Sequence, residues 1–171
     1  MSAPRREKID AHADSIPGAI RVAARAMVIE HGKLLVMNYR DEHGFWCVTP
    51  GGGVRKKETL KSGVRREVEE ELGLTLEVGD IVYVRELLGS SAKVLHGGIT
   101  EDTHQLEVFF RCKRLGEPSL GTHPDKFCTG FAWASLEDLP ALNFFPEALA
   151  HRLAADVAAG FRPINNYMGD A

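Results

Sequence analysis

Hydrophobic and polar positions along this chain predict a mixed fold of strands and helices. Several short apolar stretches, rich in Val, Ile, Leu and Phe, are separated by turn residues, which is typical of strands. We predict strands at residues 20–29, 33–39, 81–88, 105–111 and 131–134. We predict helices at residues 59–72 and 146–159. Strands and helices that alternate along a chain favour the α/β class.

The segment from Thr59 to Leu72 carries the clearest helix signals. Thr59 is a suitable N-cap, because its side-chain oxygen can accept a hydrogen bond from an amide of the first turn. Gly73 suits the left-handed residue that often ends a helix. Apolar residues recur every four positions and form one stripe, made of Leu60, Val64, Val68 and Leu72. This stripe can pack on a sheet.

Three carboxylates share a neighbouring face of the same helix. Glu67, Glu70 and Glu71 fall within an arc of about 100°, because they are three and four residues apart. Like charges at this spacing repel one another, and the negative end of the helix dipole disfavours them further. A residue pattern that is locally unfavourable, as this cluster of carboxylates is, often marks a functional site. Carboxylates without His or Cys suit a hard cation such as Mg²⁺ better than zinc.

Glycines lie before and within this helix. Gly51, Gly52 and Gly53 follow Pro50, and such a loop can bring backbone groups against phosphate or metal. Gly63 falls on the acidic face, where it costs about 0.5 to 1 kcal/mol relative to Ala. Close approach of a ligand would explain that cost.

The glycine loop and the acidic helix together resemble the Nudix box, G-x5-E-x7-R-E-U-x-E-E-x-G-U, in which U is aliphatic. Every specified position is matched, by Gly52, Glu58, Arg66, Glu67, Val68, Glu70, Glu71, Gly73 and Leu74. A chance match has a probability of about 10⁻⁷ at ordinary residue frequencies. Residues 34–53 also resemble the strand, loop, Trp and Pro-Gly-Gly that precede the box in this family. Lys57 and Gly63 depart from common choices at unspecified positions.

The resemblance implies an α/β/α sandwich with a mixed central sheet, whose box binds Mg²⁺ or Mn²⁺. The implied metal ligands are the carbonyl of Gly51 and the carboxylates of Glu67, Glu70 and Glu71. Glu58 and Arg66 would brace the site, with Arg66 orienting the acids through charge-assisted hydrogen bonds. The catalytic residues would thus be Glu58, Arg66, Glu67 and Glu70. The implied reaction is hydrolysis of a nucleoside diphosphate linked to another moiety.

The general base is left open by the sequence. Glu67 or Glu70 could deprotonate water, but several branches of the family use an acid from a distant loop. The candidates outside the box are Glu101, Asp102, Glu107 and Asp125. Glu107 could instead be a cross-strand partner, and His104 and His123 could be bases or hydrogen-bonded strand-edge residues. The Gly89–Thr103 stretch is predicted to be a long loop, and long loops are often functional.

Substrate contacts are predicted at three residues. Arg40 could bind phosphate, Trp46 could stack on a base or pack in the core, and Glu107 is a further candidate. The residues beyond the box lack the proline of ADP-ribose hydrolases and the tyrosine of dinucleoside polyphosphate hydrolases, and the coenzyme A signature is also missing. A nucleoside triphosphate is therefore slightly favoured over a nucleotide sugar. The alternative is a nucleotide-sensing or regulatory Nudix domain without turnover, against which the intact box argues.

Composition adds exclusions to this picture. A length of 171 residues suits one domain, predicted at residues 18–165 between a tail at 1–17 and another at 166–171. A net charge of −3 gives no pull toward nucleic acid or anionic membrane. No long apolar segment is present, so a cytoplasmic protein is expected. Three separated cysteines favour buried thiols, and Phe144 and Phe145 leave a homodimer contact open.

Overall fold

The computed structural model describes residues 18–93, 95–122, 124–162 and 166–170. The predicted N-terminal tail, residues 1–17, lies outside the described residues, as does His123. The described strands form one mixed sheet in the order β8-β3-β2-β1-β6-β5-β9, with β4 joined to β1 and β7 joined to β2. Their bounds are β1 Arg21–Glu30, β2 Lys33–Asp41, β3 Gly44–Val48, β4 Gly51–Gly53, β5 Thr75–Leu88, β6 His104–Leu115, β7 Cys128–Ser135, β8 Phe144–Phe145 and β9 Tyr167–Asp170.

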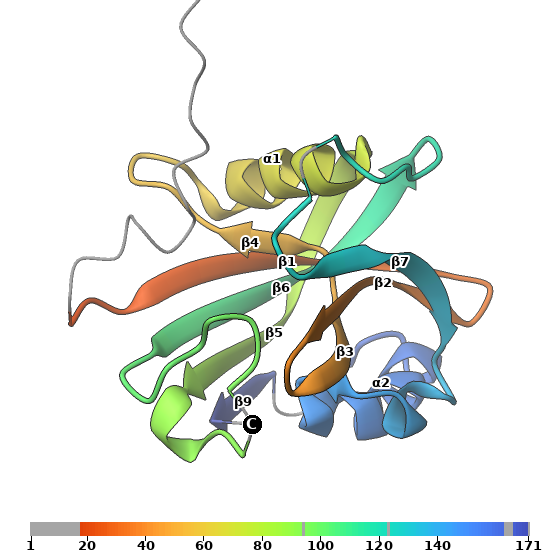
Figure 1. The fold of residues 1–171 in the computed structure, drawn as a ribbon. Coiled ribbons are helices and arrows are strands. Elements are labelled where there is room, and N and C mark those ends of the chain that lie inside the picture. Colours follow the sequence, from red (N-terminus) through yellow and green to blue (C-terminus); the bar gives the residue numbers. More distant parts are fainter. Residues whose placement is uncertain (1–17, 94, 123, 163–165, 171) are drawn as a thin grey trace, which may run out of the picture.

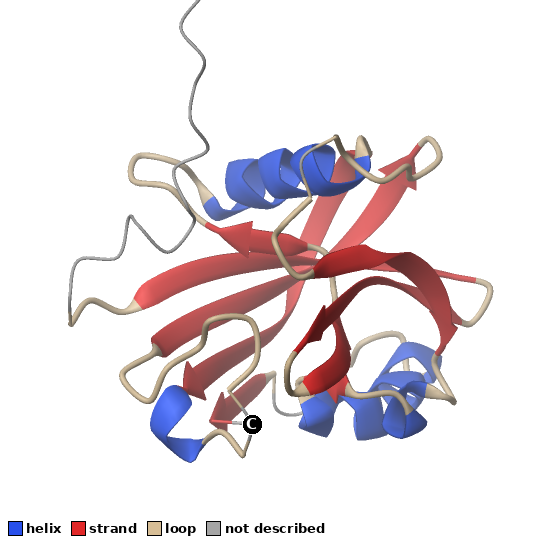
Figure 2. Cartoon of the chain, in the orientation of Figure 1, coloured by secondary structure: helices blue, strands red, loops and turns tan. Residues whose placement is uncertain are grey.

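The helices lie on opposite sides of this sheet, α1 (Leu60–Leu72) above it and α2 (Glu147–Ala158) below it in Figures 1 and 2. The stripe of α1 packs with buried residues of β1 and β6, and α2 packs in a second cluster on the other side of the sheet. The sheet is mixed because β1 runs parallel to β6 and antiparallel to β2 and β4. The predicted α/β/α sandwich with a mixed central sheet is confirmed.

Both predicted ends of the acidic helix are confirmed. The side chain of Thr59 accepts a hydrogen bond from the amide of Ser62 at 3.1 Å. Gly73 ends the helix in the left-handed conformation, with φ 57° and ψ 22°. The residues between them form α1 without interruption.

The loop between β6 and β7 caps the carboxyl end of α1 through residues 119–121, a contact that the sequence did not reveal. The amide of Ser119 donates to the carbonyl of Leu72 at 2.9 Å, and the amide of Gly121 donates to that of Glu71 at 2.7 Å. A Cβ atom at Gly121 would overlap the carbonyl oxygen of Glu70. These bonds satisfy carbonyls that a helix end leaves without partners, and they bring the loop up to the acidic face.

Several strands differ from the predicted ones. β5 begins at Thr75, six residues before the predicted Ile81, because buried Leu76 and Val78 alternate with exposed neighbours. The sequence analysis also missed β4 and β8. Residues 167–170, which were predicted to belong to a C-terminal tail, form β9 and pair in parallel with β5.

Other expectations concern the core and the surface. Cys47 and Cys112 are buried, Cys128 is half-buried, and all three are free thiols. Phe144 is buried and Phe145 packs partly buried against the core, which accounts for both rings without a second subunit. In the described part of the chain, no helix has the length and apolar character needed to cross a membrane.

Candidate active site

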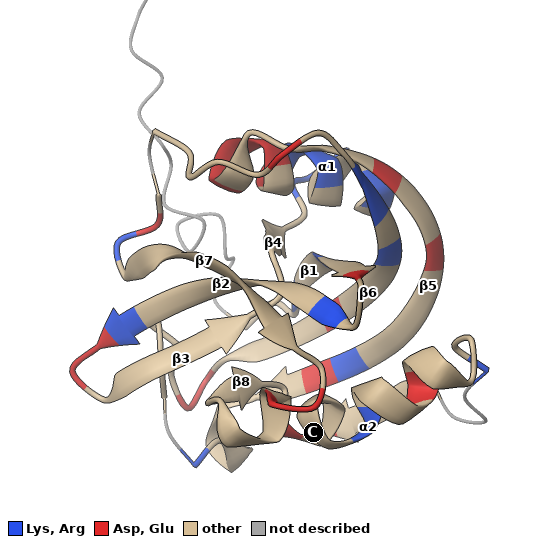
Figure 3. Ribbon diagram, turned by 90° about the vertical axis from the view of Figure 1, so that its right-hand side faces the viewer, with Lys and Arg blue, Asp and Glu red and all other residues tan. Residues whose placement is uncertain are grey.

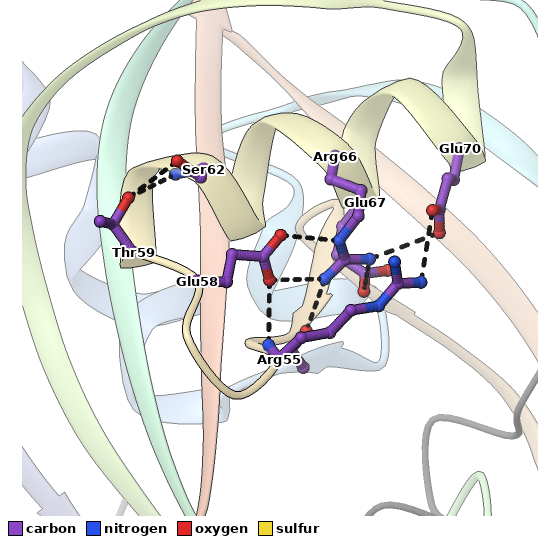
Figure 4. A network of polar contacts seen from close by, with 8 residues as sticks. Arg55, Glu58, Thr59, Ser62, Arg66, Glu67 and Glu70 are labelled. Carbon is purple, nitrogen blue, oxygen red and sulfur yellow. Dashed lines mark hydrogen bonds and ion pairs between the residues drawn. The ribbon is translucent and has the colours of Figure 1, made fainter.

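Arg66 is the centre of a network that joins the glycine loop to the acidic helix (Figure 4). Its guanidinium donates to both carboxylate oxygens of Glu58, at 2.8 and 3.0 Å, and to Glu67 at 2.6 Å. It also donates to the backbone carbonyl of Gly53 at 2.9 Å. The hydrogen bonds from Arg66 hold the pKa of Glu58 below its usual value. The predicted bracing role therefore corresponds to direct contacts.

Glu67 and Glu70 face this arginine but differ in exposure. The side chain of Glu67 is 18% exposed and that of Glu70 is 40% exposed. Glu70 is held only loosely, by Arg66 at 3.4 Å and Arg55 at 3.5 Å. A Cβ atom at Gly52 would lie 2.7 Å from the carboxylate of Glu67. Glycine at this position therefore lets the Glu67 carboxylate approach the loop closely.

Glu71 points away from Arg66 and into the protein. Its carboxylate accepts a hydrogen bond from the amide of Gly51 at 2.9 Å and from the hydroxyl of Tyr39 at 3.4 Å. Burial raises the pKa of Glu71 to about 8, against the opposing effects of the Gly51 amide and the Arg25 charge. No arginine bonds directly to Glu71 among the contacts of the described residues.

These residues fit a hard divalent cation in their chemistry. Three carboxylates lie on α1 and the Gly51 carbonyl lies on the neighbouring β4, and all are oxygen ligands of the kind that Mg²⁺ and Mn²⁺ prefer. Within the described residues, no three acidic, His or Cys side chains are close enough to form a ready-made metal cluster. Arg66 lies between Glu67 and Glu70 instead, and it supplies positive charge to both carboxylates.

A second arginine network supports the glycine loop from the other side and was missed by the sequence analysis. Arg25 on β1 donates to the carbonyl of Gly51 at 3.1 Å and to the carboxylate of Glu107 at 3.0 Å. Glu107 is 4% exposed and also accepts from Arg85 at 3.0 Å and from Gln105 at 2.9 Å. Arg25 therefore connects β6 to the carbonyl that is a predicted metal ligand.

The environment of Glu107 favours a structural role over a role as base. Burial alone would raise the pKa of Glu107, but the charges of Arg25 and Arg85 bring it below its usual value. A carboxylate that is fully paired inside the protein is a poor proton acceptor. The alternative of a cross-strand partner agrees with this geometry, since Glu107 lies opposite Arg85 in the sheet. One signal was available: Arg25 and Glu107 are charged residues with an apolar residue on each side in the sequence.

Gly63 does not face a ligand, contrary to the interpretation from the sequence. It is buried, and a Cβ atom there would lie 3.1 Å from Val54 and 3.2 Å from the Glu58 carboxylate. The close approach that explains this glycine is therefore that of the box loop itself. Absence of a side chain allows Val54 and Glu58 to pack against the first turns of α1.

The remaining candidates lie at different places. Asp125 is exposed on the capping loop, and its charge is near enough to raise the pKa of Glu71 further. Glu101 and Asp102 lie in an exposed turn before β6, and His104 bonds to Glu86 at 3.3 Å. Arg40 is exposed and follows Tyr39 on β2, so alternation along the strand directs it to the face opposite Tyr39 and Glu71.

Trp46 is part of the core and also belongs to a group of stacked rings. It is 6% exposed, and the rings of Tyr39 and His96 both stack on it. Tyr39 in turn bonds to Glu71, so these rings adjoin the acidic face. Figure 3 shows that charged residues lie along α1, whereas β3 and β7 carry none. The site thus combines a charged helix with an uncharged aromatic region.

Comparisons with known proteins agree with this geometry. A family model described as the NUDIX domain matches residues 19–154. A nucleoside triphosphatase, NudI, from Enterobacter sp. (strain 638) is 29% identical over 100 residues, which cover 58% of this chain and 68% of that protein. A MutT-like protein from Streptomyces ambofaciens is 36% identical over 95 residues, which cover 54% of this chain and 51% of the relative. The chain thus spans about half the length of the second relative.

Solved structures show the same fold. The crystal structure of a MutT Nudix hydrolase from Burkholderia pseudomallei is similar with a TM-score of 0.60 and 26% identity, covering 77% of this chain and 95% of that one. A MutT protein from Methanosarcina mazei Go1 has a TM-score of 0.63 and 20% identity, covering 87% and 100% of the two chains. Because the family model spans most of the chain and the box residues form the expected network, this protein belongs to the Nudix hydrolase family.

Proposed function

We propose that this protein is a Mg²⁺- or Mn²⁺-dependent pyrophosphohydrolase that cleaves the diphosphate linkage of a nucleoside diphosphate derivative. A nucleoside triphosphate is slightly preferred over a nucleotide sugar in this proposal. The observation that carries it is the network of Arg66, which holds Glu58, Glu67 and the Gly53 carbonyl in one rigid group beside Glu70 and Glu71. The relative named as a nucleoside triphosphatase supports the preferred substrate class.

Each residue of the site has a distinct task in this proposal. Glu67, Glu70, Glu71 and the Gly51 carbonyl would hold the cation, and Arg66 keeps two of the carboxylates oriented. A bound Mg²⁺ or Mn²⁺ would neutralise the diphosphate oxygens and lower the pKa of water. Arg66 would orient the acids before the substrate arrives, and preorganised charge of this kind is a large part of catalysis.

The general base is proposed to be Asp125, with Glu70 as the second candidate. Asp125 is the acid outside the box whose charge acts on Glu71, and it lies on the loop that caps α1. It is exposed, so a water molecule can reach its carboxylate. Glu70 is more exposed than Glu67, and each of its carboxylate oxygens has only a long contact, to Arg55 at 3.5 Å and to Arg66 at 3.4 Å.

A phosphate-release screen tests the proposal. Nucleoside triphosphates, nucleotide sugars and dinucleotides are incubated with Mg²⁺ or Mn²⁺, and the products are identified by mass. Glu70→Gln and Glu71→Gln should each lower kcat by about 100-fold or more while leaving the fold intact. Glu69→Gln is the matched control, because Glu69 is exposed on the same helix and lies outside the network. Full Mg²⁺-dependent turnover in both variants would refute the assignment of the site.

The same screen separates this proposal from the alternative of a nucleotide-sensing domain. A sensor would show no release from any compound, yet a nucleotide would raise its melting temperature, because a ligand that binds only the folded state stabilises it. A hydrolase shows both release and stabilisation. The hydrolase is favoured because the acidic residues of the box are all present and Arg66 bonds to two of them, Glu58 and Glu67.

A further inference from the structure

The ring of Trp46 is covered by an imidazole from a distant loop. Trp46 lies on β3, and the ring of His96 from the Gly89–Thr103 loop stacks on it with centroids 4.6 Å apart and planes inclined by 26°. The ring of Tyr39 on β2 also stacks on Trp46, at 5.3 Å and 16°. We call Tyr39, Trp46 and His96 the ring column. Two of its members come from the sheet, and the third comes from a loop.

A buried carboxylate fixes the position of His96. The imidazole Nδ1 lies 3.2 Å from each carboxylate oxygen of Asp41, and the amide of Gly97 donates to the same carboxylate at 3.2 Å. The side chains of His96 and Asp41 are only 8% and 6% exposed. Asp41 therefore fastens the loop at this point, at the end of β2.

The loop itself has features of a segment that can open. Its ends are joined by a hydrogen bond from the amide of Gly89 to the carbonyl of Thr103, at 2.7 Å. Apart from the short turn Gly89–Ser91, its described residues form neither helix nor strand. Gly97 and Gly98 follow His96 with φ of 63° and 84°, a region that glycine enters without cost. A change of backbone conformation at these two glycines would move His96.

The ring column leads away from the acidic face. The hydroxyl of Tyr39 bonds to Glu71, so one end of the column adjoins the proposed metal ligands and the other lies under the loop. A substrate whose diphosphate is held at α1 would extend its remaining part along this column. Aromatic rings stack with centroids about 4.5 to 7 Å apart, and the imidazole of His96 lies within that range of Trp46.

We propose that His96 occupies, in the closed form of the protein, a site on Trp46 that binds the planar ring of the substrate, and that movement of residues 95–103 exposes this site. The ring is a nucleobase, and this assignment rests on the proposed function. Binding exchanges one stacked ring for another, so His96 acts as an internal competitor. The apparent affinity for a nucleotide is then reduced by the fraction of molecules in which the loop is closed.

Fluorescence of Trp46 measures this exchange directly. The chain has two tryptophans, so the Trp133→Phe variant reports Trp46 alone. This protein is titrated with nucleoside monophosphates, which lack a diphosphate bond, and with inorganic pyrophosphate, which lacks a ring. His96→Ala should tighten nucleoside monophosphate binding about threefold to tenfold, the worth of one aromatic pair, and leave pyrophosphate binding unchanged. Asp41→Asn should act in the same direction, because it releases His96.

Lys93→Ala is the matched control, since Lys93 is exposed on the same loop and forms only a surface ion pair with Glu147. It should leave both affinities unchanged. Weaker or unchanged nucleotide binding in both His96→Ala and Asp41→Asn would overturn the inference. Turnover with no response of Trp46 to nucleotide would also overturn it while leaving the hydrolase in place. A response of Trp46 without turnover would support the ring site and refute the proposed function.

Discussion

Replacing Glu107 by Gln should strongly destabilise this protein, because Glu107 is the counterion of a buried arginine, Arg85, and of a half-buried one, Arg25. The carboxylate accepts hydrogen bonds from Arg25 and Arg85, each at 3.0 Å, and the side chains of these arginines are 16% and 6% exposed. Arg85 also has one buried nitrogen, Nε, without a partner among the described residues. The neutral amide of Gln would leave two positive charges in the interior without a balancing negative charge.

Breaking a buried ion pair by removing one partner costs about 3 to 5 kcal/mol. Gln retains one acceptor oxygen, so we expect the lower end, about 3 kcal/mol of the free energy of unfolding. In a domain of this size, that loss lowers the melting temperature by about 6 to 12 °C. It also lowers the urea concentration at the unfolding midpoint by about 1 to 2 M, if the free energy of unfolding falls with urea at the usual slope.

Urea unfolding followed by circular dichroism measures this loss, with Glu77→Gln as the control. Glu77 is exposed on β5, so its variant should differ from the wild type by less than about 0.5 kcal/mol. Because the pKa of Glu107 is lowered by folding, its ionisation stabilises the protein above the unfolded pKa and ceases to do so as pH falls through the folded pKa. As pH falls from about 5 to the folded-state pKa of Glu107, the free energy of unfolding should therefore decrease less in the variant than in the wild type. A variant as stable as Glu77→Gln would refute the counterion role.

Three further predictions concern the site. Gly121→Ala should lower the free energy of unfolding by about 1 to 3 kcal/mol, because the added Cβ would overlap the Glu70 carbonyl oxygen. A denaturant titration measures this loss, and an unchanged unfolding midpoint would show that the capping loop can shift without cost. Asp125→Asn should lower kcat about 100-fold in steady-state assays without changing the melting temperature, whereas Asp102→Asn should change neither. Mg²⁺ at about 100 times its dissociation constant should raise the melting temperature by about 5 to 11 °C. Glu71→Gln should abolish most of this rise in melting temperature. A rise as large as that of the wild type would exclude Glu71 as a metal ligand.

Local signals were sufficient to predict the acidic helix and its caps. Thr59 and Gly73 act within one turn of the helix ends, so their effect depends on neighbours in the sequence rather than on the fold. The same holds for the spacing of the box carboxylates, which the helix itself fixes. The family and the fold class followed from these residues because the box pattern is specific.

Contacts between distant parts of the chain were not predictable in the same way. Arg25 and Glu107 are 82 positions apart, and only the parallel pairing of β1 with β6 brings them together. β9 pairs with β5 along an edge, and nothing in its four residues specifies that partner. Gly63 was assigned to a ligand because the sequence could not show that the box loop folds back over the helix.

The link between Glu71 and Tyr39 joins the two halves of the site and explains why the box alone does not define the substrate. Glu71 belongs to the acidic face, and its carboxylate accepts from the Tyr39 hydroxyl, while the ring of Tyr39 stacks on Trp46. In the proposed function, α1 would therefore bind the charged diphosphate, whereas the group attached to the diphosphate would meet β2, β3 and the Gly89–Thr103 loop. These elements lie outside the box motif. Because Tyr39 contacts both Glu71 and Trp46, we expect a ligand ring that displaces Trp46 to alter the position of the Glu71 carboxylate as well, since no arginine among the described residues is hydrogen-bonded to that carboxylate.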